Sequence, residues 1–172
     1  MYTIISGTNR EKSNTLKVAR EYQHFLKDKV IDAALFASAN VNLLSRDATF
    51  YQIENEIIKP TTHFLFITPE YNGSFPGILK LLFDNSSSHN IWWNKKALLA
   101  GVSTGRAGNL RGMEHLAAIL NYLKITVYPN LLPISLVNKL MDESGKFTDA
   151  VSIDVINKQL DEFILWGGKN CR

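Results

Sequence analysis

The sequence predicts a single α/β domain, built as a doubly wound parallel sheet of five strands with helices on both faces. The chain has 172 residues, which fits one domain able to bury a core without disulfides or metals. Short apolar runs alternate along it with segments in which apolar residues recur at helical spacing. Such repeated strand–helix units imply parallel strands joined by right-handed crossovers. We therefore expect residues 1–172 to form one domain.

The run at residues 63–68 carries the clearest strand signal, because it is nearly continuous in β-forming residues. The lack of polar alternation is typical of a strand that helices cover on both faces. Further strands are expected at residues 2–5, 30–36, 97–102 and 125–127, although Asp32 weakens the second. Helices are expected to begin near Ser13 and at Pro76, and to cover residues 50–59, 113–120 and 151–166. Pro60 stops the helix at 50–59.

Composition excludes several classes of protein. Hydrophobic residues make up 45% of the chain and charged residues 20%, with a net charge of +3 and no basic run, so no nucleic-acid partner is expected. The apolar runs fall short of the roughly 20 residues of a membrane helix, and the first residues lack the basic and apolar pattern of a signal peptide, so none is expected. A single cysteine, Cys171, permits neither an internal disulfide nor a cysteine-rich zinc site. We expect a soluble cytoplasmic protein without membrane contact.

Three loops follow the first, third and fourth predicted strands, where open α/β sheets bind ligands. The first, residues 6–15, supplies hydroxyls, Gly7, Arg10 and the start of a helix. Helix N-terminal amides, hydroxyls and a guanidinium together suit a phosphate group. On this loop alone, a plain helix cap at Ser13 or Asn14 with a solvated Arg10 is an equally good interpretation.

The second and third loops are rich in small residues. In residues 68–77, Gly73 and Gly77 allow a ligand to approach the backbone closely, Tyr71 suits a flat ring and Asn72 suits its polar edge. The alternative is an ordinary turn whose tyrosine covers the edge of the core. Residues 103–109 offer exposed amides around Gly105, a pattern common to many strand–helix connections.

Together the three loops closely resemble the NADPH-dependent FMN reductase family, a flavodoxin-like group that includes many chromate, quinone and azo-dye reductases. The most specific signature comes directly after the third strand and reads Pro69-Glu70-Tyr71-Asn72-Gly73-Ser74, then Pro76-Gly77 and Leu79-Lys80. The first loop resembles the family's phosphate loop through Gly7-Thr8-Asn9-Arg10 with Ser13 and Asn14, and the third through Ser103-Thr104-Gly105 and Gly108. The similarity runs in consistent order from about residue 3 to 125.

This resemblance implies FMN as cofactor and NADPH or NADH as co-substrate, with hydride passing through the flavin to flavin, quinone, azo or similar acceptors. Chemistry centred on the flavin requires no catalytic side chain, and none is expected, nor any metal site. The resemblance assigns the FMN phosphate to Thr8, Arg10, Ser13, Asn14 and Thr15. It assigns one side of the isoalloxazine ring to Pro69, Glu70, Tyr71, Asn72 and Gly73, and its other edge to Ser103, Thr104, Gly105 and Arg106.

Two residues depart from the family pattern. Thr8 stands where serine is usual, which keeps the hydroxyl. Asn109 follows Gly108, where the family often has a second glycine. Asparagine tolerates positive φ better than most residues, so FMN binding is expected to survive, while nicotinamide and acceptor contacts stay open. Arg10, Arg106 and Arg111 are each candidates to meet the 2′-phosphate of NADPH.

Two other functions share these features. A flavodoxin-type electron carrier would have the same fold and cofactor, but such carriers are typically acidic, whereas this chain has a pI of about 8.9. A flavin-binding module without turnover is the second alternative. The family resemblance also implies a homodimer or homotetramer. Phe75, Ile91, Trp92 and Trp93 could meet a second copy, although the tryptophans suit a role covering the sheet edge better.

Overall fold

A computed structural model describes residues 1–168, and Cys171 lies outside the described residues. Its sheet has the strand order β2-β1-β3-β4-β5, with β6 also beside β4, and every pairing is parallel. The doubly wound parallel sheet is thus confirmed. The strands are β1 (Tyr2–Ser6), β2 (Ala33–Ala37), β3 (His63–Pro69), β4 (Lys96–Val102), β5 (Thr126–Val127) and β6 (Leu132–Ile134).

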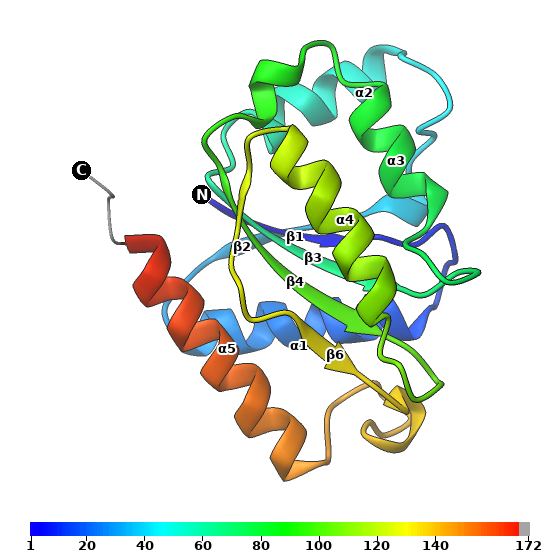
Figure 1. Cartoon of the computed structure of the whole chain (residues 1–172), viewed down its shortest axis with the longest axis vertical. Helices are drawn as coiled ribbons and strands as arrows, with labels where there is room; N and C mark the ends of the chain where they lie inside the picture. The colour runs from blue at the N-terminus through cyan, green and yellow to red at the C-terminus, as the bar shows by residue number, and fades with distance from the viewer. Residues whose placement is uncertain (169–172) are drawn as a thin grey trace.

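Helices cover both faces of the sheet (Figure 1). One layer consists of α1 (Asn14–Asp28) and α5 (Ala150–Gly168), and the other of α2 (Ala48–Ile53), α3 (Gly77–Asp84) and α4 (Leu110–Tyr122). The described residues also include four short helical turns: η1 (Ser38–Asn40), the π-helical η2 (Glu54–Ile58), η3 (His89–Trp92) and η4 (Val137–Lys139). Within residues 1–168 no helix is long and apolar enough to span a bilayer. The same residues hold no group of three His, Cys, Asp or Glu suited to a metal ion.

Two separate cores explain the unbroken apolar run of β3. Phe64 and Phe66 belong to the core under α2, α3 and α4, whereas Leu65 and Ile67 belong to the core under α1 and α5. All four side chains are fully buried. Successive residues of a strand point to opposite faces, so a strand covered on both sides needs apolar residues at every position, as the sequence pattern predicted.

The second strand begins three residues later than expected. Val30 has φ of 61° and is 94% exposed. Its N–H donates to Lys27 O at 2.9 Å, and the N–H of Ile31 donates to Leu26 O at 2.9 Å. This is how a helix ends on a left-handed residue, a position that glycine usually takes. Because valine rarely takes this conformation, the sequence did not indicate that a helix ends at Val30, and residues 30–32 were predicted as strand.

Two further segments differ from the prediction. The helix expected at residues 50–59 is α2 followed by the π-helical turn η2, which ends with a hydrogen bond from Lys59 N to Glu54 O at 2.8 Å. The strand expected at residues 125–127 is β5, which pairs with β4. After a turn closed by a hydrogen bond from Leu131 N to Pro129 O at 3.0 Å, the chain pairs with β4 again as β6, which the sequence did not predict. Prolines at 129 and 133 concealed β6 from a reading based on β-forming runs.

Trp92 is fully buried, and its indole N–H donates to Ser86 Oγ at 2.9 Å. Its ring packs against Phe64 and Phe83, with centroids 5.4 and 5.1 Å away. The interpretation that Trp92 meets a second copy is therefore wrong, and it covers the sheet instead. Trp93 is 42% exposed, with the Lys124 ammonium 3.7 Å above its ring.

Candidate functional site

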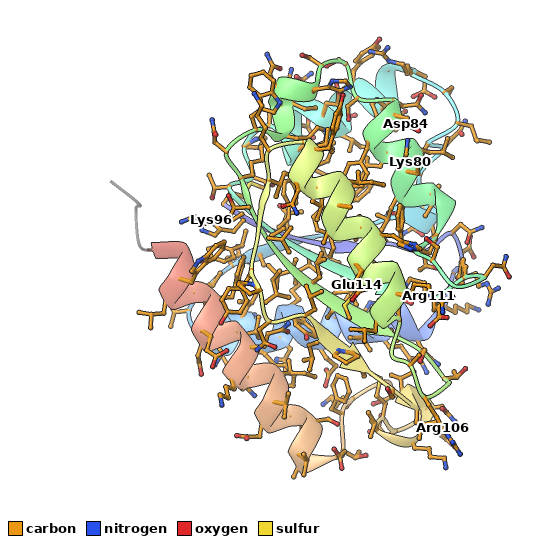
Figure 2. All side chains as sticks on the ribbon, viewed as in Figure 1. Lys80, Asp84, Lys96, Arg106, Arg111 and Glu114 are labelled. Carbon is orange, nitrogen blue, oxygen red and sulfur yellow. The ribbon has the colours of Figure 1, made fainter. Side chains whose placement is uncertain are left out.

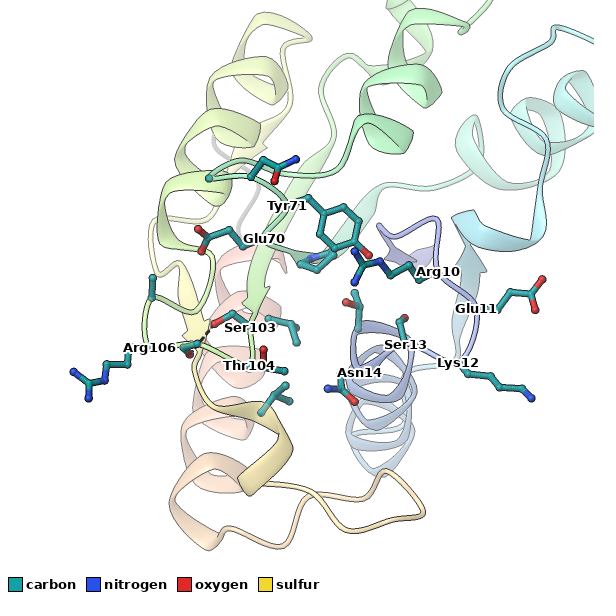
Figure 3. A pocket seen from close by; sticks show the side chains of 18 residues that line it. Arg10, Glu11, Lys12, Ser13, Asn14, Glu70, Tyr71, Ser103, Thr104 and Arg106 are labelled. Carbon is teal, nitrogen blue, oxygen red and sulfur yellow. Dashed lines mark hydrogen bonds between the residues drawn. The ribbon is translucent and has the colours of Figure 1, made fainter.

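The loops after β1, β3 and β4 meet at one edge of the sheet, because these three strands are neighbours and run in the same direction. Between them lies a cavity of about 640 Å³ (Figure 3), within the range of roughly 300–1,000 Å³ typical of small-molecule sites. Of the residues that the sequence nominated, all but Thr8 line this cavity. They are Arg10, Ser13, Asn14, Thr15, Pro69, Glu70, Tyr71, Asn72, Gly73, Ser103, Thr104, Gly105 and Arg106.

One end of the cavity is formed by the start of α1. Ser13 is its N-cap and accepts a hydrogen bond from Leu16 N at 3.1 Å. The amides of the first helical turn, including those of Asn14 and Thr15, have no acceptor within the helix and carry the positive end of its dipole. Arg10 adds a cation at this end, whereas the Lys12 side chain points away from the cavity (Figure 3). This end suits a phosphate group.

Thr8 lies beneath the cavity wall. It is 1% exposed, its hydroxyl is 2.7 Å from the Tyr71 hydroxyl, and the same oxygen accepts a hydrogen bond from Arg10 N at 3.1 Å. Thr8 therefore connects the first loop to the second instead of facing the cavity. The sequence identified Thr8 as a site residue but not this supporting position.

Arg10 stacks on Tyr71, with its guanidinium carbon 4.4 Å from the ring centroid. Figure 3 shows the guanidinium beside the aromatic ring at the mouth of the cavity. Such cation–π contacts restrict a long side chain and hold its charge in place. Tyr71 thus orients Arg10 and also forms part of the cavity wall.

The second loop is a tight hairpin. Tyr71 N donates to Ser74 O at 2.9 Å, and Ser74 N donates back to Tyr71 O at 3.1 Å. Between them Asn72 and Gly73 have φ of 52° and 76°, the positive pair of a type I′ turn. Ser74 Oγ also lies 3.0 Å from Nδ1 of His115 on α4. The loop is therefore held in shape from two sides.

The third loop is closed by Ser103. Its hydroxyl donates to Gly105 O at 2.9 Å and accepts from Gly108 N at 3.0 Å. Leu136 N donates to the same Gly105 carbonyl at 3.0 Å and ties the loop to the segment after β6. The Arg106 side chain points away from the cavity (Figure 3).

Of the three arginines considered for a 2′-phosphate, Arg10 and Arg106 line the cavity and Arg111 does not. Figure 3 shows the Arg10 guanidinium beside Tyr71 and the Arg106 side chain pointing outward. Arg106 lies on the third loop and Arg111 on α4, both on the right-hand side of the molecule in Figure 2. Arg111 lies beside the second loop, with a guanidinium nitrogen 3.2 Å from where a Cβ on Gly73 would stand.

Asn109 links two of the loops from below. It is fully buried, and its φ of 63° confirms that asparagine takes the left-handed conformation there. Its amide nitrogen donates to Thr68 O and Pro69 O, both at 2.9 Å. The sequence marked Asn109 only as a departure from a family pattern and did not predict this bridge.

The fold and the three-loop cavity define a flavodoxin-like α/β protein whose cavity lies at the carboxyl edge of its parallel sheet. The chain belongs to the NADPH-dependent FMN reductase family, whose model matches residues 2–138. The flavoenzyme NAD(P)H:(acceptor) oxidoreductase FerB from Paracoccus denitrificans superimposes with a TM-score of 0.82 at 20% identity, covering 96% of each chain. An archaeal flavodoxin superimposes with a TM-score of 0.59 at 12% identity, covering 98% of this chain and all of the flavodoxin chain. At these identities the likeness confirms the flavodoxin-like fold alone.

Curated relatives carry reductase names. An NAD(P)H-dependent FMN reductase of Pseudomonas aeruginosa is 34% identical over 116 residues, 64% of this chain and 62% of that protein. A 2-hydroxy-1,4-benzoquinone reductase of a Burkholderia species is 28% identical over 107 residues, 59% of this chain and 58% of that protein. The chain thus matches about six tenths of the length of these two relatives. A quinone reductase of Pseudomonas putida is 27% identical over 176 aligned positions, 95% of this chain and 92% of that protein.

Proposed function

We propose that the protein binds FMN in the cavity between its three loops and uses NAD(P)H to reduce a small-molecule acceptor. The observation that carries this proposal is a cavity with phosphate-binding groups at one end and a preformed hairpin at the other. Membership of a family named for NADPH-dependent reduction of FMN supports the same ligand.

The donors at the start of α1 fit the phosphate of FMN. Arg10 is oriented by Tyr71, and the amides of Asn14 and Thr15 open α1 behind the Ser13 cap. Charge-assisted hydrogen bonds from a guanidinium and amides at a helix N-terminus are the usual partners of a phosphate dianion. We assign the phosphate to Arg10 and to these amides, with Thr8 supporting Arg10 from below.

The second and third loops fit the isoalloxazine ring. The hairpin presents Asn72 and Gly73 to the cavity, and the third loop presents Thr104 and Gly105 across from it. Backbone amides aimed at a ring edge stabilise negative charge there without reorganising. Bound FMN supplies the chemistry by which hydride passes from NAD(P)H to an acceptor. The chain's own role is to hold the ring with one face open, to which both substrates have access.

We propose quinones as the first acceptors to test, ahead of free flavins and azo dyes, because relatives covering most of this chain are named quinone reductases. The rival function as a one-electron carrier has no support beyond the flavodoxin-like fold. We further propose a homodimer or homotetramer acting in the cytoplasm, where NAD(P)H is available.

The decisive experiment mixes the FMN-loaded protein anaerobically with excess NADPH, and separately with NADH, while the flavin absorbance near about 450 nm is followed. Bleaching in a single two-electron step, followed by recovery on addition of a quinone, is expected. Because both substrates need the same open face, initial-rate plots at several quinone concentrations should give parallel lines. Flavin that stays oxidised with both donors would favour the module without turnover.

A further inference from the structure

The Asn109 side chain occupies a space that two glycines leave open for it. Gly101 on β4 and Gly112 on α4 flank it, and a Cβ on Gly112 would overlap Oδ1 of Asn109. A Cβ on Gly101 would lie 3.0 Å from the Asn109 Cβ and would also overlap the carbonyl of Gly108. Positions 101 and 112 therefore have to be glycine as long as the Asn109 side chain stays where it is.

The Asn109 side chain bonds to the backbone of β3 and not to its own helix. As the first residue before α4 it makes no side-chain cap hydrogen bond, although asparagine commonly caps helices. Both protons of its amide instead go to the carbonyls of Thr68 and Pro69, which end β3 immediately before the hairpin. Its Oδ1 is buried and has no partner among the described residues. A buried acceptor without a partner is costly, so the two donated bonds must offset that cost.

We infer that Asn109 is a positioning residue for the flavin ring, an inference that rests on the proposed FMN site. It fastens the root of the hairpin loop to the root of the third loop, and so fixes the gap between the two walls that would enclose the isoalloxazine. Asn109 itself does not line the cavity. A glycine here would keep the left-handed backbone but would leave these walls unlinked.

The test compares Asn109→Gly with a matched control, Gln159→Leu. Gln159 is also fully buried and donates to two backbone carbonyls, those of Leu99 at 3.1 Å and Asn130 at 2.8 Å. It does not line the cavity. Binding of FMN and of riboflavin is titrated by flavin fluorescence at a temperature where circular dichroism shows every variant folded. Visible circular dichroism of the bound flavin reports the asymmetry of its surroundings.

Asn109→Gly should weaken the binding of FMN and the binding of riboflavin by the same factor, about tenfold for two lost hydrogen bonds. It should also change the visible circular dichroism of the bound flavin. The equal factor distinguishes ring positioning from phosphate binding. Gln159→Leu should lower the unfolding temperature while leaving both affinities and the flavin spectrum unchanged. Equal affinities in Asn109→Gly and wild type, or equal losses in both variants, would overturn the inference.

Two additions keep the outcome decisive. If Asn109→Gly does not fold, Asn109→Asp provides the same comparison, because it keeps the size and the left-handed tendency of the residue and removes both donors. Hydrogen exchange on the flavin-free protein gives a second readout: amides of Tyr71 and Ser74 should exchange faster in Asn109→Gly and not in Gln159→Leu. Wild type that binds no flavin would contradict the proposed function, while the exchange result would still decide the role of Asn109.

Discussion

At the scale of single residues, most residues that line the cavity were predictable from the sequence, but the contacts that each of them makes were not. Arg10, Ser13 and Asn14 were identified by type and position after a strand, and they line the cavity. Thr8 was grouped with them, yet its hydroxyl contacts Tyr71 beneath the wall. Which member of a cluster faces the ligand depends on side-chain packing between distant loops, and one-dimensional spacing contains no record of that packing.

Arg10→Ala should weaken FMN binding roughly 10- to 150-fold, because a charge-assisted hydrogen bond contributes about 1.5–3 kcal/mol. Riboflavin, which lacks the phosphate, should lose little affinity from the same change. Arg20→Ala serves as the control, because Arg20 lies on the exposed face of α1. This substitution removes the same charge as Arg10→Ala. Fluorescence titration measures all four affinities. FMN affinity equal to that of wild type would refute the assignment of the phosphate to Arg10.

At the scale of elements, Lys95 shows how one side chain completes a helix end. It is 7% exposed, and its ammonium donates to the carbonyls of Ile58 at 2.5 Å, Lys59 at 3.0 Å and Thr61 at 2.6 Å. The first of these carbonyls belongs to the last residue of the π-helical turn η2 and the other two come just after it, where the last carbonyls of a helix lack partners within it. A cation there also complements the negative end of the dipole.

Lys95→Met should therefore destabilise the fold by about 1–3 kcal/mol, the cost of leaving buried acceptors without a donor. Lys80→Met is the matched control, because Lys80 forms an exposed pair with Asp84 on α3 and such pairs contribute about 0.3–0.5 kcal/mol. Urea unfolding monitored by circular dichroism gives both differences. Similar small losses in the two variants would show that Lys95 does not stabilise this helix end.

His63, at the start of β3, packs against Phe163 of α5, and its burial leads us to expect that stability depends on pH. Its ring stacks on Tyr2 with centroids 4.6 Å apart and meets Phe163 edge-on at 5.9 Å. Burial lowers the pKa of His63 below its usual 6.5, against an opposing effect of its hydrogen bond to Gly167 O, and the charges of Lys96 and the N-terminus add smaller downward contributions. Between the lowered pKa and 6.5 the unfolded chain binds a proton that the folded chain does not. Stability contributed by neutral His63 is thus present above pH 6.5 and is lost as the pH falls below it.

The free energy of unfolding of wild type should accordingly fall more steeply between about pH 7.5 and pH 5 than that of His63→Phe. Subtracting one curve from the other cancels the contributions of groups that the substitution leaves unchanged. Parallel curves would show that burial of this imidazole does not couple stability to pH.

At the scale of the whole molecule, exposed apolar side chains still support the proposed homodimer, although Trp92 is buried and is not among them. Phe75 and Ile91 are partly exposed, and Trp93 and Tyr122 are 42% and 76% exposed. Light scattering at micromolar concentration should report about twice the 19.4 kDa of one chain, or about four times for a tetramer. Tyr122→Lys should shift the mass toward the monomer. A monomeric wild type would contradict the proposal.

The layout of the molecule was largely predictable, because parallel strands buried on both faces leave a strong apolar signal. The boundaries of the helices and strands were less predictable. Val30 ends α1 in a conformation that valine rarely adopts, and β6 exists only because β4 offers it a partner. Both depend on contacts between segments far apart in the sequence. The bridge made by Asn109 belongs to the same category.

The cavity depends on β1, β3 and β4, the three inner neighbours of the sheet, and this makes its occupancy a measure of global folding. A partly unfolded chain that has lost any one of these strands has lost part of the binding site. A ligand held there favours the complete domain by mass action, by about 2.7 kcal/mol at a free concentration one hundred times its dissociation constant. Cofactor supply in the cell would then set how much of the protein survives heat and proteolysis, quite apart from how much of it turns over.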